Sequence, residues 1–197
     1  SENTKFPYTF YELQHLGSTE FLTIAKKHEY LVYLGWRGWS DSAVKLNYNL
    51  NLQQKAKEIV TNIRQQHTEF SVLHLRRGDM VENVRPDQYY CQVKEHSEPC
   101  KVVRILRDNV NPGCAVYIMT NGTSEYVEQI VSELNSEFFV FTKTTLKELD
   151  FIGKKDNYEL FVIELCMAEL ADKIISNRNW ENLFKNPNVI DVGPKLY

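Results

Sequence analysis

The chain has 197 residues, of which 43% are hydrophobic and 25% are charged, values typical of a folded globular domain. This composition excludes intrinsic disorder and fibrous structure. The net charge of −3 provides no bulk positive field to recruit nucleic acid or an anionic membrane, so local charge would have to hold any anionic ligand. No apolar run approaches the roughly 20 residues that cross a bilayer, and we expect no membrane span in this chain.

Residues 1–50 are rich in aromatic side chains and have no sustained periodicity. We expect them to form a short N-terminal segment with one or two short helices. Within it, Trp36 and Trp39 could form a platform for a sugar, because indole faces stack on the apolar faces of pyranose rings. Tryptophans in such a segment more often belong to a core or a domain interface, and that alternative stays open.

From residue 51 onward, apolar runs of strand length alternate with segments of helical periodicity. Asn51 is the expected cap of the first helix and Ser124 that of a later one. Glu164, in the last helix, is expected at a solvent-exposed edge. The predicted strands are 70–75, 115–119, 138–141, 173–177 and 188–191, and the predicted helices are 51–66, part of 88–106, 124–133 and 158–170. The alternation predicts one α/β domain over residues 51–197, with a Rossmann-like parallel sheet and flanking helices.

Polar residues gather at the carboxyl ends of three predicted strands, where open parallel sheets bind their ligands. They are His74, Arg76, Arg77, Gly78 and Asp79 at the first strand, Thr120 and Asn121 at the second, and Ser176 and Asn177 at the fourth. We expect these three groups of residues to converge on one crevice.

The residue types at the first strand suit a nucleoside diphosphate. An arginine offers a planar fork of donors to phosphate oxygens, and Arg76 beside Arg77 could hold two oxygens of a diphosphate together. Gly78 lets the backbone approach a ligand closely, Asp79 could hold one guanidinium, and His74 could donate to a phosphate or a sugar hydroxyl. Paired arginines at a strand end can also be structural ion-pair partners.

The string His74-Leu75-Arg76-Arg77-Gly78-Asp79 resembles the H-x-R-R-x-D motif of the fucosyltransferase superfamily, which includes α-1,2-, α-1,6- and protein O-fucosyltransferases. Gln88-Tyr89-Tyr90 and the segments 116–120 and 172–177 are similar to later parts of that superfamily. The resemblance spans about residues 52–180. It implies a GT-B-type nucleotide-binding half, and it implies that the preceding acceptor half is missing, much reduced, or supplied by another domain of a larger polypeptide.

The resemblance also implies an activity and residue roles. The implied reaction is an inverting, metal-independent transfer of a sugar, L-fucose from GDP-fucose, to a hydroxyl of a glycan or protein, with no cofactor. Arg76 would bind the donor diphosphate and stabilise the leaving nucleotide, with Arg77 and His74 beside it and Asp79 orienting them. Glu82 is the preferred base for the acceptor hydroxyl. Asp87 is the alternative base, on the acceptor side.

The sequence departs from the superfamily pattern at two places: Asn121 stands where an acidic residue is usual, and Arg178-Asn179-Trp180 replaces a stretch rich in Ser and Thr. Two alternatives therefore stay open, a non-catalytic module that binds a nucleotide sugar or glycan, and a glycosyltransferase domain that uses another nucleotide sugar. Arg77-Gly78-Asp79 as an adhesion tripeptide and a nucleic-acid-binding role have little support.

The four cysteines contain no C-x-x-C pair, and a zinc site is not expected. Reduced thiols are the simplest interpretation, although Cys91 and Cys100 could close a loop in an oxidising compartment. Asn121-Gly122-Thr123 is a formal glycosylation sequon. The location therefore stays open between the cytoplasm and the lumen of the Golgi or endoplasmic reticulum.

Overall fold

The computed structural model describes residues 49–81, 88–177 and 186–193, with the side chains of 79–80 and 88–90 left out. The chain divides after Asn49, and every element below belongs to the second unit, Leu50–Tyr197. The expected N-terminal segment, with Trp36 and Trp39, lies outside the described residues except at its end. Glu82 and Asp87 also lie outside them.

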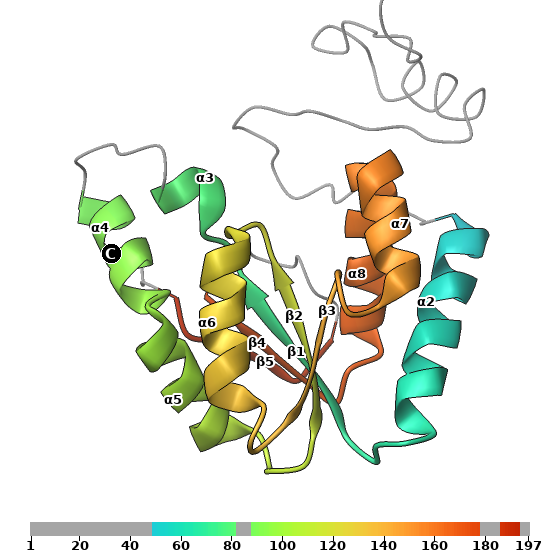
Figure 1. Ribbon diagram of the computed structural model, residues 1–197, viewed down its shortest axis with the longest axis horizontal. Helices are drawn as coiled ribbons and strands as arrows, with labels where there is room; N and C mark the ends of the chain where they lie inside the picture. The colour runs from blue at the N-terminus through green and yellow to red at the C-terminus, as the bar shows by residue number, and fades with distance from the viewer. Residues whose placement is uncertain (1–48, 82–87, 178–185, 194–197) are drawn as a thin grey trace, which may run out of the picture. The chain divides into compact units, whose positions relative to one another are not determined.

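A five-stranded parallel sheet forms the centre of the domain (Figure 1). Its strands lie in the order β3-β2-β1-β4-β5. Their bounds are Phe70–Leu75 for β1, Ala115–Thr120 for β2, Phe139–Thr142 for β3, Lys173–Ser176 for β4 and Val189–Asp191 for β5. All six residues of β1 are buried, as expected for the central strand of a sheet covered on both faces.

Helices cover both faces of the sheet (Figure 1). On one face lie α2 (Leu50–Arg64), α7 (Lys147–Lys155) and α8 (Asn157–Glu169), and α8 packs on both of the others. On the other face lie α4 (Gln88–His96), α5 (Pro99–Asn109) and α6 (Ser124–Leu134), with α5 packed on α6. A one-turn helix, α3 (Gly78–Val81), follows β1 directly. The predicted Rossmann-like α/β fold is confirmed.

Strand alternation divides the core into two layers. Leu73 and Leu75 of β1 join Val116 and Ile118 of β2 in a buried cluster with the apolar faces of α5 and α6. Tyr117 points to the opposite face, where its hydroxyl reaches Glu164 of α8. The carboxyl edge of the sheet presents polar groups from β1, β2 and β4.

Several helix limits differ from the sequence-based expectations. Asn51 lies inside α2, which begins one residue earlier, and Thr123 rather than Ser124 caps α6 by accepting a hydrogen bond from Tyr126 N. Helix α3 was expected as loop. The whole of α7 was not predicted. It has only nine residues, and its buried apolar side chains are Leu149 and Ile152.

In the described part of the chain, no helix is both long and apolar enough to cross a membrane. All four cysteines are described, and all are free thiols. Cys91 and Cys100 are exposed, whereas Cys114 and Cys166 are buried. The structure therefore shows no bond between Cys91 and Cys100.

Candidate functional site

The candidate site lies at the carboxyl end of β1, the point at which the order of strands along the chain reverses. The chain builds β1, β2 and β3 toward one edge and then crosses back to place β4 and β5 on the other side of β1. In open α/β sheets this topological switch point is the place where a crevice forms and ligands bind. The end of β1 contributes His74, Arg76 and Arg77, and the neighbouring ends of β2 and β4 contribute the residues described next.

His74 and Ser176 meet between β1 and β4. The strand register pairs them, and the Nδ1 atom of His74 lies 2.9 Å from the Ser176 hydroxyl. Both residues are buried. Because each side chain is fixed by the other, the sheet holds the imidazole ring in one orientation at the switch point.

Asn177 fastens the backbone of Arg76 through both halves of its side-chain amide. Its Oδ1 atom accepts a hydrogen bond from Arg76 N at 2.8 Å, and its Nδ2 atom donates to Arg76 O at 3.2 Å. Asn177 is buried, so neither bond competes with bulk water. The backbone from which the partly buried Arg76 side chain projects is therefore fixed by the end of β4.

Thr120 and Asn121 fasten the same turn from the β2 side. The Thr120 hydroxyl donates to Leu75 O at 2.7 Å, and Asn121 Oδ1 accepts from Arg77 N at 2.9 Å and Gly78 N at 3.0 Å. A Cβ atom at Gly78 would overlap the carbonyl oxygen of Asn121, so only glycine fits this approach. Asn121 thus caps α3 by accepting hydrogen bonds from the N–H groups at its start.

The sequon Asn121-Gly122-Thr123 acquires a structural explanation from these contacts. Asn121 caps α3, and Thr123 caps α6. The asparagine and the threonine of the sequon are therefore explained by the starts of α3 and α6, and the sequon needs no glycan to account for it.

The Arg77 side chain turns away from β4 toward the junction of α4 and α5. Its Nη1 atom donates to Ser97 Oγ at 2.7 Å and to Ser97 O at 3.2 Å, and its guanidinium carbon lies 4.4 Å from the centre of the Tyr126 ring. The Tyr126 hydroxyl donates to the same Ser97 carbonyl at 2.7 Å. Burial raises the pKa of Tyr126 to about 12, against the opposing effect of the Arg77 charge.

The structure brings eight of the predicted site residues to one edge of the sheet. They are His74, Arg76, Arg77, Gly78, Thr120, Asn121, Ser176 and Asn177. Asp79 is the second residue of α3, and its side chain is not among those described. Ser97 and Tyr126 were missed. The sequence offers no signal for them, because they meet Arg77 only through tertiary packing.

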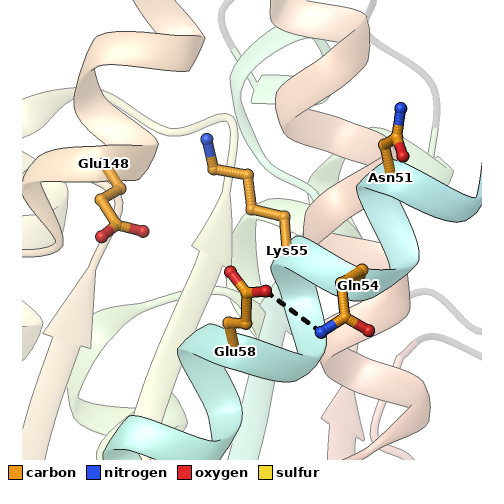
Figure 2. Close-up of a pocket in the computed structure, with 5 residues that line it drawn as sticks. All are labelled: Asn51, Gln54, Lys55, Glu58 and Glu148. Carbon is orange, nitrogen blue, oxygen red and sulfur yellow. Dashed lines mark hydrogen bonds between the residues drawn. The ribbon is translucent and has the colours of Figure 1, made fainter.

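Two hollows in the described part of the chain are lined by other residues. One, shown in Figure 2, is lined by Asn51, Gln54, Lys55 and Glu58 of α2 and by Glu148 of α7, and Gln54 Nε2 donates to Glu58 Oε1 at 3.1 Å. The other lies between α2 and the segment that follows β3. Neither contains a predicted site residue. Among the described residues, no group of His, Cys, Asp and Glu has an arrangement that could hold a metal ion.

The prediction for Glu164 was wrong, because the structure buries this side chain instead of leaving it at a solvent-exposed edge. The Tyr117 hydroxyl donates to Glu164 Oε1 at 2.6 Å. Burial raises the pKa of Glu164 to about 7, and the Tyr117 hydrogen bond and the Lys143 charge reduce the rise. The sequence did contain a signal for this burial, because α8 is the most apolar helix described. Such a helix packs on several sides, and α8 contacts α2, α7 and the sheet.

This buried carboxyl should make the protein less stable as pH rises from about 4.5 to about 7. Over that window the folded protein keeps the Glu164 proton while the unfolded chain releases it at the ordinary pKa of 4.5, so unfolding is favoured. The shift corresponds to about 3 kcal/mol of unfolding free energy. Urea denaturation at pH 5 and pH 8 measures this loss of stability.

Glu164→Gln should remove this pH-dependent contribution, whereas Glu128→Gln, on an exposed side chain, should not. Equal pH dependence in wild type and Glu164→Gln would contradict the assignment.

Fold and site together define an α/β protein of the doubly wound class, with a polar, arginine-bearing turn at its switch point. Comparison with protein-family models, with curated proteins and with solved structures finds no match for this chain.

Proposed function

We propose that residues 51–197 are the GT-B-type donor-binding half of an inverting, metal-independent glycosyltransferase. It transfers L-fucose from GDP-fucose to a hydroxyl of a glycan or protein. The observation that carries the proposal is the position of the segment resembling H-x-R-R-x-D. It begins in the central strand and ends at the topological switch point, with its backbone fastened by the ends of β2 and β4.

In this proposal Arg76 binds the donor diphosphate, with His74 held beside it by Ser176. When the bond between the sugar C1 atom and the diphosphate oxygen breaks, negative charge develops on the leaving GDP. A guanidinium fixed in place stabilises that charge more in the transition state than in the ground state, because it does not have to reorganise during the reaction. The arginine thus performs the task that a divalent cation performs in other glycosyltransferases.

The acceptor hydroxyl attacks C1 from the face opposite the leaving group, which inverts the configuration of the sugar. Glu82, four residues beyond Gly78, is the proposed base that takes the acceptor proton as the new C–O bond forms. We assign Asp87, Trp36 and Trp39 to the acceptor side.

Calorimetric titration of the purified chain with GDP, GDP-fucose, UDP and UDP-glucose, each with a chelator present, tests the donor. Selective binding of GDP and GDP-fucose is expected. Preference for UDP would retain the glycosyltransferase class and reject the donor. No binding of any of the four nucleotides would reject the assignment of the site to this chain alone.

Turnover separates an enzyme from a binding module. We expect slow hydrolysis of GDP-fucose, because water can replace the acceptor, and we expect Glu82→Gln to lower its rate at least tenfold with GDP affinity unchanged. Release of GDP measured over hours provides the rate, with Glu98→Gln as a control on an exposed carboxyl. Tight binding with no hydrolysis would support the module. Normal hydrolysis in Glu82→Gln would move the base elsewhere.

A further inference from the structure

The two arginines of the motif have different surroundings. The backbone of Arg76 is held by Asn177 of the β4 end, and the backbone of Arg77 is held by Asn121 on the opposite side of β1, where the Arg77 side chain also binds Ser97. A pair of phosphate-binding arginines would present both guanidinium groups to one ligand. The Arg77 guanidinium is instead bound to Ser97 at the junction of α4 and α5.

The Arg77 side chain is partly buried, and its guanidinium contacts two protein groups. Ser97, which is fully buried between α4 and α5, accepts two hydrogen bonds from it, through its hydroxyl and its carbonyl oxygen. The buried ring of Tyr126 lies against the guanidinium, in the geometry of a cation–π contact. The Ser97 hydroxyl is itself fixed, because it donates to Val93 O at 2.7 Å. Reaching a phosphate over the strand end would require Arg77 to leave all of these contacts.

Tyr126 ties this arrangement to α6. Its hydroxyl donates to the Ser97 carbonyl that Arg77 also uses, so one buried carbonyl joins the β1 end, the α4–α5 junction and the first turn of α6. A partly buried guanidinium held by two hydrogen bonds and a ring contact resists displacement, since leaving the site would break all three contacts.

The backbone passes this constraint to Arg76. Residues 77 and 78 donate to Asn121, and the adjacent peptide of residue 76 is held by Asn177. Loss of the Arg77 side-chain contacts would remove one of the restraints on this turn, and we expect the Arg76 guanidinium then to sample more orientations. A ligand must restrict such motion again when it binds, and that lowers its affinity.

We propose that the two arginines divide the work: Arg76 contacts the ligand, and Arg77 is a positioning residue that, with Tyr126 and Ser97, holds the Arg76 turn in its binding geometry. The ligand named here, a nucleoside diphosphate, rests on the proposed function. The coupling from Tyr126 to Arg76 does not, because it is a property of the protein without ligand.

Substitutions at Tyr126 test the coupling without changing any charge. Tyr126→Leu removes both ring and hydroxyl and should weaken GDP binding at least tenfold, whereas Tyr126→Phe keeps the ring and should weaken it about threefold. Tyr158→Leu, on an exposed tyrosine of α8, is the matched control and should leave GDP affinity unchanged. Unchanged or tighter GDP binding by a folded Tyr126→Leu would overturn the proposal, since an arginine that contacts the ligand directly would gain freedom to do so.

A nuclear magnetic resonance readout keeps the test independent of the proposed function. The Nε–Hε signal of Arg76, assigned from its loss in Arg76→Lys, should shift or broaden in ligand-free Tyr126→Leu and stay in place in Tyr158→Leu. If the wild-type chain binds no GDP, the proposed function fails, and this signal alone decides the positioning role. An unchanged Arg76 signal would overturn it. Should Tyr126→Leu fail to fold, Tyr126→Phe and Ser97→Ala apply the same test, and an unchanged signal in both would overturn the proposal.

Discussion

Replacing Arg76 by alanine should reduce GDP affinity about a hundredfold or more and leave the fold intact. Hydrogen bonds to a charged group contribute about 1.5–3 kcal/mol each, and a guanidinium can make two such bonds to a diphosphate. The fold should survive because the clamps on residue 76 use its backbone N–H and carbonyl, which alanine retains. Calorimetric titration with GDP measures the loss, and thermal unfolding checks the fold.

Two further variants make this result specific. Arg104→Ala removes an exposed arginine of α5 and should bind GDP as the wild type does. Arg76→Lys keeps the charge but loses the planar fork, and should recover only part of the affinity. Wild-type affinity in a folded Arg76→Ala would remove the residue on which the proposed donor site depends.

Replacing Gly78 by alanine should destabilise the protein by about 3 kcal/mol or more. In helix α3 alanine would by itself be favourable, because its intrinsic helix propensity exceeds that of glycine by about 1 kcal/mol. The close approach to Asn121 makes the expected change in stability unfavourable instead. The new Cβ atom would overlap the Asn121 carbonyl oxygen, and both sides of that contact are backbone, so relief requires the turn to move. Urea denaturation measures the change.

Gly113→Ala is the matched control for this prediction. Gly113 has a positive φ of 83° and no atom within 4 Å of the added Cβ, so its cost is conformational alone, about 1–2 kcal/mol. Gly78→Ala should therefore cost more, and should also weaken GDP binding, since Asn121 would lose its contacts with the turn. A Gly78→Ala protein as stable as the wild type would show that the turn is not fixed in this way.

The sequence was sufficient to predict the fold because strands and capped helices leave local signatures. The β1 run Phe70–Leu75 is mostly apolar and was predicted with its observed bounds, and the limits of the four further strands were placed within about one residue. The failures have local causes too. Helix α7 is short and buries only Leu149 and Ile152, and α3 is a single turn held by Asn121, a residue remote in sequence.

The candidate site was predictable in place but not in its internal contacts. Polar residues following apolar runs indicate strand ends, and parallel strands bring those ends to one edge, so the convergence of His74, Arg76, Asn121 and Ser176 followed from the pattern. The hydrogen-bond partners of these residues could not be predicted from the pattern. Nothing in the sequence distinguishes an asparagine that contacts a ligand from one that fastens a backbone turn.

What the sequence by itself determined is the Rossmann-like α/β class, the strands and the edge where polar residues gather, because each depends on periodicity over a few residues. Only the tertiary structure decided which side chain meets which. Asn177 reaches Arg76 across 101 positions, and Tyr126 lies under Arg77 while sharing the carbonyl of Ser97, 29 positions before it. Glu164 is buried because β2 places Tyr117 opposite it. Such contacts depend on sheet order and helix packing, which bring together residues whose separation along the chain carries no periodic signal.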